Sequence, residues 1–252
     1  HRHSSRHLCV PTENGGIFLG FHYCNINKPD ENEEHIYIYA DSVSFYLVCD
    51  NRHITELFNK IPSDAPAFTA LASFFQLLTE KDVDRLEKIE DEITGLEDRL
   101  ITSKHCDTAM GSAIVRERRN LLKIKRYYEQ LSIVTGDLLA AADRLTDRER
   151  SSLGTIDRRL HHLLNTVISL REYTTQVREA YQAQIDIEQN QIMKIFTVLT
   201  AVFSPLSLIV GWYGMNFNMP EYLWHSGYLY VISLSIVVLI ICILFFKHKK
   251  WY

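Results

Sequence analysis

The sequence predicts an α+β protein that is mainly helical, with a partial α/β domain, a very long helix that enters a membrane, and a hairpin with a second span. Three observations predict this class: β-branched and aromatic runs near the start, long segments with apolar residues spaced by three and four, and two uncharged stretches near the end. The average composition of the 252 residues, 46% hydrophobic and 23% charged, is typical of a soluble protein. Glu221, however, is the only charged residue between Ile195 and Phe246. The chain therefore divides into a charged body and an apolar tail.

Residues 1–64 are predicted to form the partial α/β domain. Three short β-branched and aromatic runs within them are typical of strands, namely Ile17–Tyr23, His35–Ala40 and Val43–Cys49. Asp41 and Ser42 separate the last two runs, which predicts a hairpin, and a short helix is expected over Ile54–Asn59.

Residues 65–150 are predicted to be a helical region. One helix is expected over about Ala67–Lys104 and another over about Ala113–Arg144, bounded by prolines and a glycine. The acidic segment Glu80–Asp98 within the first helix is interpreted as a solvated face, with attraction of cations as the alternative.

Residues 151–194 are predicted to be a stalk that continues into the first span. Apolar residues there follow the spacing of one packing seam: Leu153, Ile156, Leu160, Leu163, Val167, Leu170, Val177 and Tyr181. Thr174 is the one polar residue in this series, and no Pro or Gly occurs between Thr155 and Pro205. We therefore expect one continuous helix from about Gly154 to Tyr213.

Two segments of 19 uncharged residues, 195–213 and 228–246, are predicted to cross the membrane. As helices, each covers roughly 28 Å, near the thickness of the hydrocarbon layer. The alternative of two buried core helices is disfavoured, because the loop 214–227 joins them into a hairpin too apolar for so polar a body. That loop holds no Lys or Arg, whereas three lysines lie in the tail 247–252. The positive-inside rule therefore places the body and both termini in the cytoplasm.

A second stripe, of polar or small residues, follows the same spacing on the opposite face of the long helix, with Met193 as its exception. Its members are Asn165, Ser169, Glu172, Gln176, Glu179, Ala183, Asp186, Asn190, Met193, Thr197, Thr200, Ser204, Ser207 and Gly211. Within lipid, a row of hydroxyls is better satisfied against other helices or water than against acyl chains. If several copies surround an axis, the stripe becomes the wall of a water-filled path, with acidic rings at Glu172, Glu179 and Asp186. Alternatively, the hydroxyls bond back to their own helix and the stripe packs on the second span.

Other patterns exclude several classes of protein. The five cysteines are odd in number and form no CxxC pair, which argues against a disulfide framework or a structural zinc site. No GxSxG, HExxH or phosphate-binding loop is present, so neither enzyme activity nor a cofactor is expected. The net charge of −4 argues against a nucleic-acid partner. Because the chain begins at His1 and shows no signal peptide, it is interpreted as a fragment.

Directly after the first span stands the tripeptide Gly214-Met215-Asn216, within the string YGMNFNMPE. A tripeptide alone is a weak signal. This one lies at the outer end of the penultimate span and is followed by MPE, a second span and a basic KHKKW tail. In this placement it resembles the motif of the CorA family of divalent-cation channels. The resemblance is specific over about Gln189–Trp251 and looser over the preceding helices.

The resemblance implies a homopentamer with a funnel-shaped cytoplasmic part, in which the first span of each subunit lines one central pore. Gly214, Met215 and Asn216 would form the selectivity motif, and Glu221 would place a charge at the outer mouth. The resemblance implies pore-lining positions that all belong to the stripe: Asn190, Met193, Ser204, Ser207 and Gly211. The spacing of the stripe adds Thr197 and Thr200 to them. Lys247, Lys249 and Lys250 would form a basic collar at the cytoplasmic mouth, or serve only as a topology signal and lipid anchor.

As a function, the resemblance implies influx of Mg²⁺ across the cell membrane, with Co²⁺ and Ni²⁺ as further candidates. In the family, Mg²⁺ bound between subunits in the cytoplasm holds the channel closed. No regulatory metal ligand is assigned, because an ungapped count reaches Thr155 where the family has an acid. Two alternatives stay open: a ZntB-like Zn²⁺ transporter, and a non-transporting helical scaffold tethered to the membrane.

Overall fold

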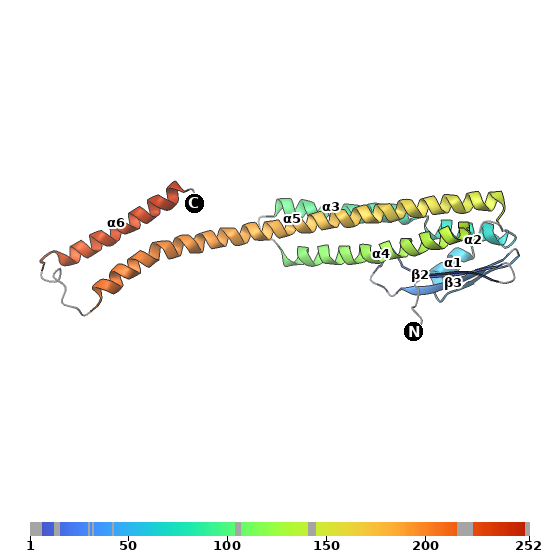
Figure 1. Cartoon of the computed structure of the whole chain (residues 1–252), viewed down its shortest axis with the longest axis horizontal. Coiled ribbons are helices and arrows are strands. Elements are labelled where there is room, and N and C mark those ends of the chain that lie inside the picture. The colour runs from blue at the N-terminus through green and yellow to red at the C-terminus, as the bar shows by residue number, and fades with distance from the viewer. Residues whose placement is uncertain are drawn as a thin grey trace. The chain divides into compact units, whose positions relative to one another are not determined.

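The structure is a computed structural model that describes residues 7–12, 16–29, 31, 33–41, 43–103, 107–140, 145–215 and 224–249. It divides into two compact units, His1–Tyr181 and Gln182–Tyr252. The boundary falls within one long helix, whose residues up to Tyr181 pack in the first unit (Figure 1).

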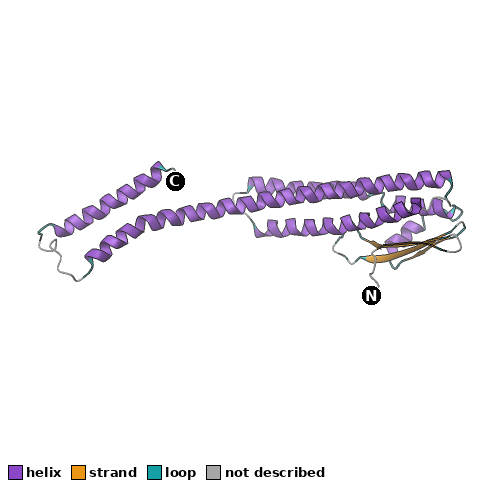
Figure 2. Ribbon diagram, in the orientation of Figure 1, coloured by secondary structure: helices purple, strands orange, loops and turns teal. Residues whose placement is uncertain are grey.

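The first unit begins with a small antiparallel sheet, coloured orange in Figure 2. It has four strands, which follow chain order. The strands are β1 (His7–Pro11), β2 (Ile17–Tyr23), β3 (Glu34–Ala40) and β4 (Phe45–Val48). Leu19 and Ile38 face each other across β2 and β3 and are fully buried, whereas Tyr37 on the other face is exposed. Because successive residues of a strand point to opposite faces, this alternation leaves one face for packing.

Helices cover that apolar face. The unit contains α1 (Arg52–Phe58), α2 (Ala67–Leu78), α3 (Asp82–Thr102), α4 (Thr108–Ala140) and the first part of α5 (Asp147–Tyr213). Helices α2 and α4 contact the sheet, and Tyr127 and Tyr128 of α4 are fully buried. The first part of α5 is joined to α4 by the Thr135 hydroxyl, which donates to Asp157 at 2.9 Å.

The predicted seam of α5 is the face that packs in this unit. Leu153, Leu160 and Val167 are fully buried, and the other members are buried except for the half-buried Tyr181. The polar member of the series, Thr174, is also buried, because its hydroxyl donates to the Leu170 carbonyl at 2.7 Å. Spacing therefore identified the packed face of α5 correctly.

Some element boundaries differ from the prediction. The helix expected over Ala67–Lys104 is wrong, because a turn at Thr79–Lys81 separates α2 from α3. Helix α4 begins at Thr108 rather than near Ala113, and β1 lies in a segment where no strand was predicted.

The long helix starts earlier than predicted, at Asp147 rather than near Gly154. The Glu149 carboxylate accepts the backbone N–H of Thr146 at 2.9 Å, and the Thr146 hydroxyl accepts the Glu149 N–H at 3.3 Å. This reciprocal pair is a capping box, which satisfies donors that the first turn leaves without partners. The sequence prediction does not include this box, because it places the start of the helix near Gly154.

The second unit contains the rest of α5 and the helix α6 (Gly227–His248). Both helices hold stretches long and apolar enough to cross a membrane. Val198 of α5 and Phe246 of α6 are buried and line the same groove. The half-buried residues of α5 lie three, four, seven, eight and eleven positions after Val198, on the same side of the helix: Ala201, Val202, Pro205, Leu206 and Ile209. One face of α5 is therefore assigned to α6.

Candidate functional site: an exposed polar face on α5

In the second unit, the polar stripe lies on the side of α5 that does not contact α6. At about 100° per residue, Thr200 lies about 160° around the helix from the buried Val198, Ser204 about 120° and Thr197 about 100°. All stripe members in this unit are exposed: Ala183, Asp186, Asn190, Met193, Thr197, Thr200, Ser204, Ser207 and Gly211. The alternative in which the stripe packs on the second span is therefore not the arrangement within this chain.

Two hydroxyls on this face have a defined orientation. The Thr197 hydroxyl donates to the Met193 carbonyl and the Thr200 hydroxyl donates to the Phe196 carbonyl, both at 2.8 Å. Bonding back to the helix, which is the other part of that alternative, thus takes place at these two residues. Because the hydroxyl proton is used in this bond, each exposed oxygen offers lone pairs and acts as a hydrogen-bond acceptor. Such a surface suits a ligand that presents O–H donors, such as hydrated metal ions.

The acidic members of the stripe are also exposed. Glu172 and Glu179 lie on the part of α5 that belongs to the first unit, and Asp186 lies in the second. The Asp186 carboxylate accepts a hydrogen bond from the Gln182 amide at 3.2 Å, one turn earlier on the same helix. No three His, Cys, Asp or Glu side chains among the described residues lie close enough to hold a metal ion.

The predicted selectivity motif starts where α5 ends. The Gly214 N–H donates to the Val210 carbonyl at 2.8 Å, and the Met215 N–H donates to the Trp212 carbonyl at 3.3 Å. A β-carbon at position 214 would lie 2.9 Å from the Val210 carbonyl oxygen, so this close approach of backbone requires glycine. Asn216 and Glu221 lie outside the described residues.

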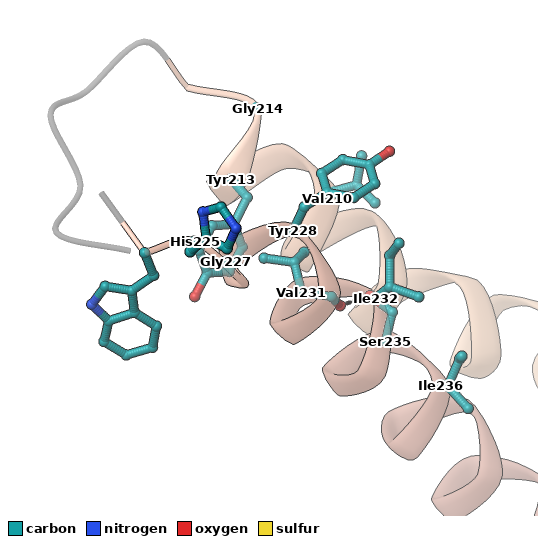
Figure 3. Close-up of a pocket in the computed structure, with 11 residues that line it drawn as sticks. Val210, Tyr213, Gly214, His225, Gly227, Tyr228, Val231, Ile232, Ser235 and Ile236 are labelled. Carbon is teal, nitrogen blue, oxygen red and sulfur yellow. Dashed lines mark hydrogen bonds between the residues drawn. The ribbon is translucent and has the colours of Figure 1, made fainter. Parts of the chain in front are cut away.

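A groove of about 650 Å³ lies beside this end of α5, between α5 and α6 (Figure 3). Val210 and Tyr213 of α5 and Val231 and Ile232 of α6 form its walls. The groove contains none of the predicted pore-lining residues. The polar face is thus separate from the apolar space between the two helices.

The predicted basic collar falls at the other end of α6. Lys247 and Lys249 are exposed there, and Lys250 lies outside the described residues. Thr155, where the resemblance predicts a regulatory acid, receives a hydrogen bond from Arg158 at 3.0 Å. A guanidinium donor at this position suits an anion better than a cation.

Sequence reasoning missed the part that Cys242 plays in supporting α5. Pro205 has no N–H, so the carbonyl of Ala201 loses the donor that a helix normally supplies. The Cys242 thiol of α6 donates to this carbonyl at 3.9 Å. A proline inside an apolar helix was the available signal, because its freed carbonyl needs a donor from a neighbouring helix.

Comparisons with known proteins identify what this arrangement is similar to. The family model described as CorA-like Mg²⁺ transporter protein matches residues 3–249. The cobalt/magnesium transport protein CorA of Thermotoga maritima is 29% identical over 184 residues, which are 72% of this chain and 52% of that protein. The magnesium transport protein CorA of Wolinella succinogenes is 29% identical over 248 residues, 93% of this chain and 75% of that protein. The chain thus spans about half and three quarters, respectively, of these two relatives.

The fold is similar to that of two solved structures. The complete structure of the CorA magnesium transporter from Methanocaldococcus jannaschii aligns with a TM-score of 0.78 at 20% identity, over 98% of this chain and 80% of that one. The cytoplasmic domain of ZntB from Vibrio parahaemolyticus aligns with a TM-score of 0.56 at 14% identity, over 73% of this chain and 75% of that one. At these identities the likeness shows the fold alone. The predicted fold class and the predicted family resemblance are confirmed.

Proposed function

The chain belongs to the CorA-like Mg²⁺ transporter family, and from that premise we propose that it forms a homopentameric channel for Mg²⁺ influx. The observation that carries the proposal is the polar face of α5, which is exposed on the side opposite α6. A row of hydroxyls and small residues in a membrane needs other helices or water around it. One copy offers two apolar helices, too few to enclose the row, whereas five copies around an axis enclose it.

The chemistry of the face suits a hydrated cation. Mg²⁺ loses its waters reluctantly. A path that binds the ion through its retained waters therefore requires less free energy than a path that removes those waters. Acceptor oxygens of Thr197 and Thr200 match the O–H donors of such an ion. The carboxamide of Asn216, repeated around the outer mouth, supplies a further uncharged ring. Weak sites of this kind allow the ion to leave again, which conduction requires.

The remaining predicted residues receive roles in the same scheme. Met193, with 62% of its surface exposed in one copy, narrows the inner pore to an apolar collar that closes by excluding water. Glu172, Glu179 and Asp186 form acidic rings that enrich cations on the cytoplasmic side. Mg²⁺ bound between subunits in the cytoplasm holds the channel closed, and the body and both termini lie in the cytoplasm.

The experiment that tests the proposal is ion flux in liposomes that contain the full chain. Wild-type protein is expected to admit Mg²⁺ down its gradient. Asn216→Ala is expected to lower that flux at least tenfold while the assembly, measured by native mass spectrometry, stays intact. Flux that is absent in the wild type, or unchanged in the variant, would favour the passive scaffold.

The choice of ion is tested in the same liposomes. We propose that Mg²⁺ and Co²⁺ are carried, since the Thermotoga maritima relative bears both ions in its name, and that Ni²⁺ follows them. Mg²⁺, Co²⁺, Ni²⁺ and Zn²⁺ are compared with and without a proton gradient. Flux that depends on the gradient and favours Zn²⁺ would support the ZntB-like alternative instead.

A further inference from the structure

The turn between α2 and α3 is a joint at which four helices of the first unit meet. Thr79, at the end of α2, is fully buried, and its carbonyl accepts a hydrogen bond from Arg159 of α5 at 2.8 Å. The same carbonyl accepts the backbone N–H of Asp82, the first residue of α3, at 3.3 Å. Arg159 also donates to the Glu80 carbonyl at 3.0 Å. One side chain of the long helix therefore binds two backbone carbonyls of the turn.

The Asp82 side chain ties this joint to α4. The carboxylate is buried and accepts the hydroxyl of the fully buried Tyr128 at 2.9 Å. Burial raises the pKa of Asp82 from 3.8 to about 6, and the Tyr128 hydrogen bond and the Arg159 charge oppose this shift without cancelling it. A carboxyl group that titrates near neutral pH thus lies inside the packed core.

The tyrosine and cysteine groups near Asp82 on the neighbouring elements stay neutral over the pH range in which Asp82 titrates. Burial raises the pKa of Tyr23, on β2, to about 12 and that of Cys24 to about 11. Burial likewise raises the pKa values of Tyr127 and Tyr128, on α4, well above 10. Arg159 of α5 supplies positive charge beside Asp82. Between pH 5 and pH 7.5, Asp82 is the one of these groups that changes its charge.

We propose that Asp82 makes the α2–α3 turn a proton-sensitive joint, which holds α3 firmly on α4 and α5 when the carboxyl is protonated and loosens when it ionises. The direction follows from linkage. A pKa raised in the folded state stabilises the fold fully below the ordinary value of 3.8, and that stabilisation is lost as pH rises through about 6. The opening equilibrium of the joint should therefore increase about tenfold from pH 5 to pH 7.5.

Arg159 of α5 donates hydrogen bonds to the same turn. The protonation of Asp82 should therefore also affect how firmly α5 packs against α2 and α3. The inference concerns the first unit alone and does not depend on the proposed transport of Mg²⁺.

The test is hydrogen exchange of the full chain in detergent at pH 5 and pH 7.5, corrected for the intrinsic pH dependence of exchange. Amides in the first turns of α3 are expected to open about tenfold more often at pH 7.5 in the wild type. Asp82→Asn, which keeps the shape and removes the titration, should abolish this dependence. Asp84→Asn changes an exposed acid in the same turn of α3 and should keep it.

A second variant keeps the test decisive if Asp82→Asn folds poorly. Tyr128→Phe removes the hydrogen bond that favours the ionised carboxylate, so the midpoint of the pH dependence should move upward from about 6. Three results would overturn the proposal: a wild type whose opening does not change with pH, an Asp82→Asn protein that retains the tenfold change, or a Tyr128→Phe protein whose midpoint stays or falls.

Discussion

The orientation of the Thr200 hydroxyl is set by its own helix and determines what this residue offers to an ion in the proposed pore. Its proton is given to the Phe196 carbonyl, so its exposed oxygen is left as an acceptor. Ser233 on α6 makes a similar bond back to its own helix, to the Tyr230 carbonyl at 2.9 Å, and is also exposed. The two residues have the same local chemistry but belong to different helices, which makes Ser233 a matched control.

Replacing Thr200 with Val keeps the shape of the side chain and removes the acceptor oxygen. Loss of one hydrogen bond to a hydrated ion, about 1 kcal/mol, should lower Mg²⁺ flux about fivefold. Thermal unfolding of the protein in detergent should change little, since Val and Thr have similar helix propensities. Ser233→Ala should leave flux unchanged. An equal loss in both variants would mean that the effect comes from helix packing rather than from the polar face.

At this scale, sequence patterns identified some residues and missed others. The stripe from Asn190 to Gly211 was found by spacing, and every member is exposed as a shared face requires. Asp82 was interpreted as part of a solvated acidic face, yet it is buried. A signal was present, because Asp82 precedes Leu86 and Ile89 by four and seven residues and so lies on the apolar row of α3. The prediction for this segment rests on its acidic composition and does not use the apolar periodicity.

Helix α5 shows what periodicity determines and what it leaves open. The seam from Leu153 to Val177 is buried as predicted, because a 3,4 spacing brings those residues onto one side of any helix. The turn at Thr79–Lys81 contains neither Pro nor Gly, so nothing local marks the end of α2. That turn depends on Arg159, which is 80 residues away and accounts for two of its carbonyls. Such long-range contacts are invisible to local patterns.

The packing role of the seam predicts a large cost for Leu160→Ala. Leu160 is fully buried, so removing its side chain loses transfer free energy and leaves a cavity, at a cost of about 2–5 kcal/mol. Asn165→Ala, on the exposed face of the same helix, should change the free energy of unfolding by less than about 0.5 kcal/mol. Denaturant unfolding of the full chain in detergent measures both. Similar values for the two variants would contradict the assignment of the faces.

The whole molecule combines a charged unit that packs its own core with an apolar unit that leaves a polar face exposed. The first unit builds a continuous buried core of aromatic and aliphatic residues within one copy. The second unit buries Val198 and Phe246 but leaves the stripe exposed. The spacing in a single sequence reveals the stripe, but it does not determine how many copies would enclose it. The pentamer is therefore proposed from family membership, and the face that lines its axis is proposed from the structure.

The central claim, that the polar face of α5 lines a water-filled path shared by several copies, is tested most directly by cysteine accessibility. Ser204→Cys is introduced into a protein whose five native cysteines have been replaced, and Mg²⁺ flux in liposomes is measured before and after a cationic methanethiosulfonate reagent is added. The account predicts that the reagent blocks flux through this variant and has no effect on the same protein with Ser233→Cys. Flux that continues unchanged after the thiol introduced by Ser204→Cys has been fully modified would contradict it.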